Sequence, residues 1–260
     1  MNSAGTSTPP HIAWRLATVV SSQWETSTTR TLLLDVPGWP GHRPGQHVDV
    51  RLSAEDGYQT ERSYSIASPP EQEHLALTVE RLQDGEVSPY LADVLQVGET
   101  VEIRGPIGGY FVWDVTVGGP LLLVAGGSGI VPLMAMLRHR MAAGAHSTDL
   151  RDVRTRLLYS SRRWDDVIYR DELAQLAQSD PTLQVAHTLT REAPAAWSGY
   201  RRRIDRAMLD AFAWSPADRP HVFVCGPTPM VEAVASALVD LGHDPSMVKT
   251  ERFGPTGPAS

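Results

Sequence analysis

The stretch LLLVAGGSGIVP, at residues 121–132, contains no charged side chain. The apolar run at 121–125 is typical of a fully buried strand, and the glycines after it suit a tight turn. Pro132 suits the first turn of a helix. The uncharged stretch extends from Val115 to Leu137, which is long enough for a membrane helix, but glycines and prolines divide it. We therefore predict a buried strand, a glycine turn and a helix, and no membrane span.

Strand and helix signals alternate from this stretch onward. Near the C-terminus, apolar residues repeat every three or four positions between Val231 and Leu241, and Gly242 can cap that helix. Alternation of this kind predicts a right-handed parallel sheet, so we expect an α/β domain at residues 117–253. The predicted strands are Leu121–Ala125, Arg156–Ser160, Leu183–Leu189, His221–Val224 and Met247–Arg252, and the predicted helices are Val131–Ala142, Val167–Gln178, Ile204–Ala213 and Pro229–Leu241.

The first half of the chain shows short strand signals separated by turn signals such as Pro37-Gly38 and Asp56-Gly57. Closely spaced strands with one short helix, near Pro89–Leu95, indicate a small antiparallel barrel at residues 12–116. Residues 1–11 lack the apolar core of a signal peptide, so we expect a disordered tail there and a second tail at 254–260. The predicted strands are Ala13–Ser21, Thr31–Val36, His47–Leu52, Arg62–Ala67, Leu75–Leu82 and Thr100–Arg104.

The composition excludes several classes of protein. The 260 residues carry a formal net charge of -7, whereas a general nucleic-acid binder would carry a clustered basic excess. Cys225 is the only cysteine, so these residues cannot supply the several thiolates of an iron–sulfur cluster, and they form no internal disulfide. A chain without disulfides suits a reducing cytoplasm, where we expect this protein.

Five short motifs follow one another in a fixed order, and each alone is weak. Together they resemble the ferredoxin–NADP reductase family, over a span from about Trp14 to Phe253. The resemblance implies a β + α/β architecture, with an antiparallel Greek-key flavin-binding barrel followed by a parallel-sheet α/β pyridine-nucleotide domain. The motifs are Arg62-Ser63-Tyr64-Ser65, Gly105-Pro106-Ile107-Gly108-Gly109-Tyr110-Phe111, Gly126-Gly127-Ser128-Gly129-Ile130-Val131-Pro132, Cys225-Gly226-Pro227-Thr228-Pro229-Met230 and Glu251-Arg252-Phe253.

The resemblance implies that the first motif lines a flavin. Arg62 would pair with the pyrophosphate, Tyr64 would lie against the isoalloxazine ring or ribityl chain, and Ser65 would lie near flavin N5. A Gly-x-x-Ser turn at Gly85–Ser88 would offer backbone N–H groups and a hydroxyl to a phosphate. Without the family, these segments suit an ordinary amphipathic strand and a surface helix capped by Ser88. The implied cofactor is FAD, with FMN as the alternative, and its predicted contacts are Arg62, Ser63, Tyr64, Ser65, Val79, Gly85, Val87, Ser88 and Phe253.

A strand, the Gly126–Gly129 turn and a helix suit a phosphate cradle, because glycines allow the backbone to approach and the helix dipole favours an anion. Alone, such a glycine run is about as often only a tight turn. Arg162 and Arg191 favour the 2′-phosphate of NADPH, while Asp165 and Asp166 keep NADH open. The arginines also suit a solvated basic rim or a docking patch for an acidic carrier. The predicted NAD(P) contacts are Gly126, Gly127, Ser128, Gly129, Ser161, Arg162, Arg191, Cys225, Gly226, Pro227 and Met230.

In the family, a cysteine at the position of Cys225 lies beside nicotinamide C4, and a glutamate matching Glu251 joins it around the flavin. The resemblance therefore implies Ser65, Cys225 and Glu251 as catalytic residues, with no metal. It predicts a flavin-dependent NAD(P)H reductase that passes electrons to a separate ferredoxin, flavodoxin-like carrier or oxygenase component. The alternatives are a reductase of free flavin or quinone, and a non-catalytic nucleotide-sensing partner subunit.

Overall fold

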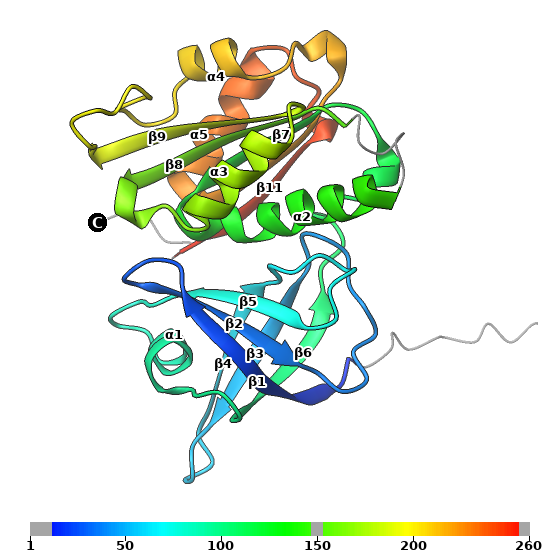
Figure 1. Ribbon diagram of the computed structural model, residues 1–260, viewed down its shortest axis with the longest axis vertical. Coiled ribbons are helices and arrows are strands. Elements are labelled where there is room, and N and C mark those ends of the chain that lie inside the picture. Colours follow the sequence, from blue (N-terminus) through cyan, green and yellow to red (C-terminus); the bar gives the residue numbers. More distant parts are fainter. Residues whose placement is uncertain (1–11, 147–152, 255–260) are drawn as a thin grey trace, which may run out of the picture.

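The computed structural model describes residues 12–146 and 153–254, which form two halves, one above the other in Figure 1. The first half is built on an antiparallel sheet and the second on a parallel sheet, so the predicted fold class is confirmed. Of the two predicted tails, residues 1–11 and 255–260 lie outside the described residues.

The antiparallel sheet has the strand order β4-β3-β6-β1-β2-β5. An isolated bridge between Ile66 and Leu77 joins the end of β4 to β5, which closes the sheet into a barrel. Alternate side chains such as Leu32, Val48 and Val50 are fully buried and fill its interior. The strands, which correspond to the six predicted, are β1 (Trp14–Trp24), β2 (Thr29–Asp35), β3 (His47–Ser53), β4 (Gln59–Ser65), β5 (Leu75–Glu80) and β6 (Thr100–Ile107).

The short helix predicted near Pro89–Leu95 is an α-turn, α1 (Val87–Pro89), followed by a π-helical turn at Tyr90–Val94. The buried Arg30 guanidinium caps the C-terminal end of this π-helical turn, because its Nη1 donates to the carbonyls of Ala92 (2.8 Å) and Leu95 (3.0 Å). Carbonyls that a side chain satisfies do not need regular helical partners. Arg30 and Ala92 are 62 positions apart, so the local sequence gave no sign of this geometry.

The parallel sheet has the order β11-β10-β7-β8-β9, and its central strand β7 is buried along its whole length. This confirms the predicted alternation of strands and helices. None of the helices in the described ranges is long and apolar enough to cross a membrane. The strands are β7 (Leu121–Gly126), β8 (Thr155–Arg163), β9 (Leu183–Glu192), β10 (His221–Pro227) and β11 (Val248–Phe253), and the helices are α2 (Ile130–His146), α3 (Arg170–Ser179), α4 (Arg206–Phe212) and α5 (Thr228–Asp240).

Two helices begin later than predicted. The helix predicted at Val167–Gln178 begins at Arg170, because Tyr169 has a left-handed backbone (φ 57°) that a helix cannot include. The helix predicted at Ile204–Ala213 begins at Arg206, because Asp205 caps it by accepting a hydrogen bond from the Met208 N–H (2.8 Å).

The two halves pack directly against each other. Helices α2 and α3 cover the face of the parallel sheet nearer the barrel, and α4 and α5 cover the other face (Figure 1). The core beneath α2 continues into the barrel through Ala67 and Ala76. Polar contacts add to this packing, since Arg138 on α2 donates to the Ala67 carbonyl (2.8 Å) and Lys249 on β11 donates to the Val112 carbonyl (3.2 Å).

Candidate functional site

In open parallel sheets a crevice forms at the carboxyl edge where the strand order reverses. From β7 the chain adds β8 and β9 on one side, then returns to add β10 and β11 on the other. Sheets of this type bind ligands outside the carboxyl ends of the strands where the order reverses, here between β7 and β10. The Gly126–Gly129 turn begins at the last residue of β7, and Cys225-Gly226 lies near the C-terminal end of β10 beside it.

Gly126, Gly129 and Gly226 at this edge leave no room for a side chain. A Cβ on Gly129 would lie 2.1 Å from the Cys225 carbonyl oxygen, and one on Gly126 would lie 2.5 Å from Met230 Sδ. A Cβ on Gly226 would lie 2.8 Å from Met230 Cε. The structure therefore brings the predicted glycine turn, Cys225, Gly226 and Met230 together. The backbone there can approach a phosphate at the N-terminal end of α2.

Cys225 and Glu251 lie side by side on neighbouring strands. They are register partners in the β10–β11 pair, so both side chains point to the same face of the sheet. Cys225 is fully buried. This burial, and to a smaller extent the nearby Glu251, raises the pKa of its thiol. The thiol is therefore neutral and is suited to packing and orientation rather than to nucleophilic attack.

Unpartnered polar atoms gather at the same edge. The buried Ser161 Oγ, Thr228 Oγ1 and Glu251 Oε2 have no hydrogen-bond partner within the described part of the chain. Ser161 is near the end of β8, Thr228 follows β10, and Glu251 is near the end of β11. Buried polar atoms are normally paired, so this cluster fits a polar ligand such as a dinucleotide. No group of three or more His, Cys, Asp or Glu among residues 12–146 and 153–254 could hold a metal ion.

The two predicted phosphate-binding arginines both have a guanidinium that no residue in the described ranges engages. Arg162 and Arg191 are exposed, and neither makes a hydrogen bond or ion pair with the rest of the described chain. Their neighbour Arg163 is held by Asp166, with contacts of 3.0 and 3.1 Å. Because β8 and β9 pair through Arg163 and Glu192, Arg162 and Arg191 lie at the same edge of the sheet. Two free cations there can bind an anion.

The first motif lies on β4 and divides between its two faces. Arg62 and Tyr64 pair with the buried Val50 and Val48, and Tyr64 packs on the barrel core, which raises its pKa to about 12. Ser63 points the other way and donates to Asp49 Oδ1 (2.7 Å). The Ser63 hydroxyl therefore lies on the opposite face of β4 from the side chains of Arg62 and Tyr64.

Ser65 ends β4 and is only 8% exposed. Its hydroxyl makes no hydrogen bond with any other described residue, so it is available to a ligand. The next residue, Ile66, forms the bridge that closes the barrel, and Ala67 accepts the bond from Arg138. Ser65 therefore lies where the barrel meets the nucleotide-binding half.

The predicted phosphate turn at Gly85–Ser88 precedes α1 and keeps its backbone tightly folded. A Cβ on Gly85 would lie 2.9 Å from Ser88 Oγ. The alternative interpretation of Ser88 as the helix cap is wrong, because Glu86 occupies the N-cap position. The Ser88 hydroxyl instead accepts a hydrogen bond from the Leu82 N–H (3.1 Å), which holds the turn against the end of β5.

Strand β5 lies between the predicted flavin-binding residues of the barrel and the glycine turn of the other half. It carries Val79, and it contacts the Gly127–Gly129 turn of the other half. Phe253 ends β11 and packs against the core cluster that contains Cys225. The buried Tyr159 hydroxyl donates a hydrogen bond to the Gly127 carbonyl (3.0 Å), which stabilises the glycine turn. The sequence did not reveal this contact. The only sequence signal of this contact was a tyrosine directly after the apolar pair Leu157-Leu158 of β8.

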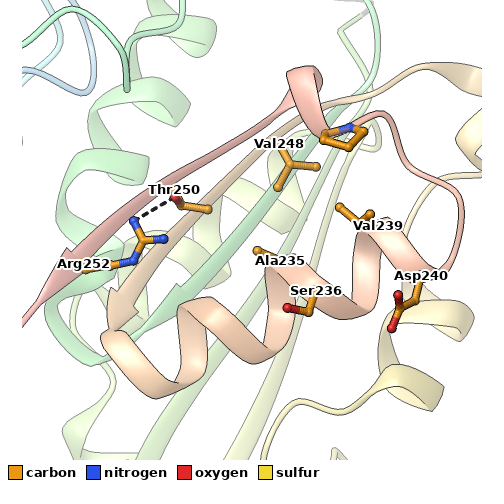
Figure 2. A pocket seen from close by; sticks show the side chains of 8 residues that line it. Ala235, Ser236, Val239, Asp240, Val248, Thr250 and Arg252 are labelled. Atoms are coloured by element: carbon orange, nitrogen blue, oxygen red, sulfur yellow. Dashed lines mark hydrogen bonds between the residues drawn. The ribbon is translucent and has the colours of Figure 1, made fainter. Parts of the chain in front are cut away.

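A hollow on the opposite face of β11 is separate from this site. Figure 2 shows it between α5 and β11, with Val248, Thr250 and Arg252 pointing into it. Side chains alternate along a strand, so Glu251 points to the other face, toward Cys225. Arg252 is held at the mouth of the hollow by Glu232 (2.6 Å). The hollow therefore does not open onto the glycine turn.

Glu251→Gln should flatten part of the pH dependence of stability. Burial raises the pKa of Glu251 from 4.5 to about 7, so the folded protein retains a proton that the unfolded chain loses above pH 4.5. The stability contributed by the neutral carboxyl is full below pH 4.5 and is lost as the pH rises through 7. The variant should gain on the order of 2 kcal/mol relative to wild type between pH 4.5 and 8, measured by urea unfolding. Parallel pH profiles for wild type and variant would show that Glu251 is not desolvated.

Two family models match the chain, each over one half. The Oxidoreductase FAD-binding domain matches residues 17–112, and the Oxidoreductase NAD-binding domain matches residues 123–236.

The chain is similar over most of its length to two named relatives and to one solved structure. It is 33% identical over 245 residues to the glycine betaine monooxygenase reductase subunit of Chromohalobacter salexigens, covering 93% of this chain and 64% of the relative. It is 32% identical over 201 residues to NADH-cytochrome b5 reductase 1 of Lodderomyces elongisporus, covering 77% and 64%. The chain thus spans less than two thirds of the length of these relatives. The structure of the Amycolatopsis cytochrome P450 reductase has a TM-score of 0.79 and 26% identity, and the match covers 99% of this chain and 74% of that one.

Proposed function

The chain belongs to the ferredoxin–NADP reductase-like family of flavoproteins, and from this we propose that it is an NAD(P)H reductase that passes electrons from NADPH or NADH through FAD to a separate carrier or oxygenase. The observation that carries the proposal is the position of the glycine turn, which lies at the strand-order reversal and against barrel strand β5. A nucleotide held there would face a flavin held along β4 and β5. We propose the division into a flavin-binding domain at 12–116 and a nucleotide-binding domain at 117–253.

The proposed FAD site lies along β4, β5 and α1. Bound FAD would accept a hydride and release electrons one at a time, which no amino-acid side chain can do. Arg62 would pair with the pyrophosphate, and the Gly85–Ser88 turn, including Val87, would hold a phosphate oxygen through backbone N–H groups. Tyr64 and Val79 would pack on the ribityl chain or ring, with Phe253 on the ring face. Ser63 would contribute through its backbone, because its hydroxyl is bound to Asp49.

The proposed catalytic residues orient the two reacting groups. Cys225 would pack a neutral thiol against the nicotinamide, and Gly226, Pro227 and Met230 would shape that side of the crevice. The free Ser65 hydroxyl would hydrogen-bond near flavin N5. Glu251, with its raised pKa of about 7, can be neutral or charged at physiological pH and would donate to or accept from the ligand through its unpartnered Oε2. Catalysis of this kind depends mainly on holding donor and acceptor close and aligned.

Loading the protein with each flavin tests whether it binds FAD in preference to FMN. Purified protein is incubated with each flavin, desalted, and its bound flavin measured by absorbance. We expect about one FAD per chain and weaker retention of FMN. Protein that retains neither flavin after this treatment would contradict the assigned site and leave only the nucleotide-sensing alternative.

We propose a preference for NADPH, because Arg162 and Arg191 are free to bind the 2′-phosphate beside Ser161. Arg191→Ala should weaken NADPH binding about tenfold and leave NADH binding unchanged, since one charge-assisted contact contributes about 1.5–3 kcal/mol. Binding is measured by titration calorimetry with NADP⁺ and NAD⁺. Arg163→Ala is the matched control, because that guanidinium is occupied by Asp166 and should not affect either nucleotide. Equal losses for both nucleotides would remove the phosphate assignment and favour the NADH use named for the cytochrome b5 reductase relative.

We propose an oxygenase component, or a small carrier that serves one, as the electron acceptor. Two of the similar proteins are named as reductases of oxygenase systems, a glycine betaine monooxygenase and a cytochrome P450. The single cysteine implies that any iron–sulfur centre in the route is held outside these 260 residues. We place the reaction in the cytoplasm, where a lone thiol remains reduced. Reduction of ferredoxin or flavodoxin should exceed that of menadione or free riboflavin, and the reverse order would favour the free-flavin or quinone reductase.

A further inference from the structure

Tyr169 occupies a strained backbone position between the two halves. Its φ of 57° and ψ of 27° lie in the left-handed region, which is unfavourable for a residue with a Cβ atom. Among the residues that the structure describes, only Arg219 is also a non-glycine residue with positive φ. Such strain persists where the surrounding structure requires the residue, so it points to a role for the tyrosine side chain.

The Tyr169 side chain fastens the nucleotide-binding half to the barrel. It is 2% exposed, and its hydroxyl donates a hydrogen bond to Thr78 Oγ1 on β5. The Thr78 hydroxyl also lies 2.8 Å from that of Thr31 on β2. The Arg138 guanidinium lies over the tyrosine ring, 4.7 Å from its centroid, and donates to the Ala67 carbonyl beyond β4. Burial raises the pKa of Tyr169 to about 12, so the phenol remains a neutral donor.

The preceding residue connects the same segment to the glycine turn. The Ile168 N–H donates to the Tyr159 hydroxyl (3.3 Å), and this hydroxyl donates to the Gly127 carbonyl (3.0 Å). Tyr159 is fully buried, so water does not compete for these bonds. Two tyrosine hydroxyls and the backbone of Ile168 and Tyr169 thus form a continuous link from β5 to the turn.

We propose that Tyr169 and Tyr159 are positioning residues that hold the Gly126–Gly129 turn in a fixed place against β5. The inference rests on the proposed function, in which β5 lies along the flavin and the turn holds the nucleotide. Hydride transfer requires its two reacting atoms about 3–3.5 Å apart and aligned, so a link between their supports controls its rate. Neither tyrosine is itself assigned contact with the reacting atoms.

The test compares Tyr169→Phe, Thr78→Val and the double variant as FAD-loaded proteins. Each substitution removes one hydroxyl from the link, and phenylalanine keeps the ring beneath Arg138. The rate constant for flavin bleaching by NADPH without oxygen should fall about tenfold in each single variant, with FAD content unchanged. The double variant should be no slower than the slower single variant, because both substitutions break the same bond. A merely structural defect would lower the amplitude of bleaching and leave the rate constant unchanged.

Hydrogen exchange supplies a readout that does not depend on activity. Amides at 75–80 and 126–130 should exchange faster in Tyr169→Phe than in wild type. Tyr110→Phe is the matched control, because its hydroxyl also reaches the other half, at 3.5 Å from the Val248 carbonyl, but the residue is 62% exposed. This control should change neither readout.

The two readouts separate the possible failures. Unchanged exchange in Tyr169→Phe would overturn the link. Faster exchange with an unchanged rate constant would overturn its positioning role. Wild-type flavin that NADPH does not bleach would contradict the proposed function, and the exchange result would still decide whether the link exists.

Discussion

Gly129→Ala is expected to destabilise the protein by about 3 kcal/mol and to weaken NADP⁺ binding by at least about tenfold. The added methyl group would lie 2.1 Å from the Cys225 carbonyl oxygen, 2.4 Å from its carbonyl carbon and 2.8 Å from the Gly226 nitrogen. All three are backbone atoms, so no side-chain rotation can relieve the overlap and β10 must separate from the turn. That movement would widen the crevice between β7 and β10. Urea unfolding and calorimetric titration with NADP⁺ measure the two effects.

Gly127→Ala is the matched control within the same turn. Gly127 has a φ of 54°, which strains alanine, but an added Cβ would have no atom within 4 Å. This variant should lose only about 1 kcal/mol of stability, from the left-handed backbone alone. If Gly129→Ala were no less stable than Gly127→Ala, the close approach of β10 to the turn would be contradicted.

Cys225→Ala is expected to slow flavin reduction by NADPH about 100-fold while leaving bound FAD unchanged. The sulfur is fully buried at the carboxyl end of β10, and removing it leaves space into which the nicotinamide can shift. A displacement of about 1 Å can lower the rate of a positioned reaction by this amount. FAD should stay bound because its proposed contacts lie mainly on β4, β5 and α1. The rate constant comes from stopped-flow absorbance without oxygen.

Cys225→Ser provides the conservative comparison. A serine hydroxyl replaces the buried sulfur with little change in volume, so it leaves less space than alanine for the nicotinamide to shift. Most of the rate should be recovered in this variant. An alanine variant as fast as wild type would remove Cys225 from the catalytic residues, and loss of FAD from it would show that the defect is not confined to the nicotinamide side.

The sequence could predict what depends on neighbouring residues. Apolar runs with β-branched residues indicated the strands, and the alternation of strand and helix after Leu121 indicated the parallel sheet. The glycines at 126–129 were predictable as a turn. The structure adds that position 129 must be glycine because a Cβ there would overlap the Cys225 carbonyl. The alternation did not fix the order of the parallel strands, and the observed order is what places the motifs after β7 and β10 next to each other.

Features that depend on distant residues could not be predicted. Tyr169 and Thr78 are 91 positions apart, and Arg30 and Ala92 are 62 apart, so neither contact leaves a local pattern. The direction of the Ser63 hydroxyl depends on Asp49 of the neighbouring strand, and that of Ser88 depends on the Leu82 N–H. The raised pKa of Glu251 arises from its burial in the folded chain, which no local signal reveals.

Anaerobic titration of the FAD-loaded protein with NADPH tests the central claim most directly. The measurement follows the absorbance of the flavin near 450 nm, where oxidised flavin absorbs and reduced flavin does not. We expect complete bleaching at about one NADPH per flavin, because one hydride carries the two electrons that a flavin accepts. A bound flavin that stays oxidised at excess NADPH and at excess NADH would contradict the account, since the crevice would then not hold a nucleotide against the flavin.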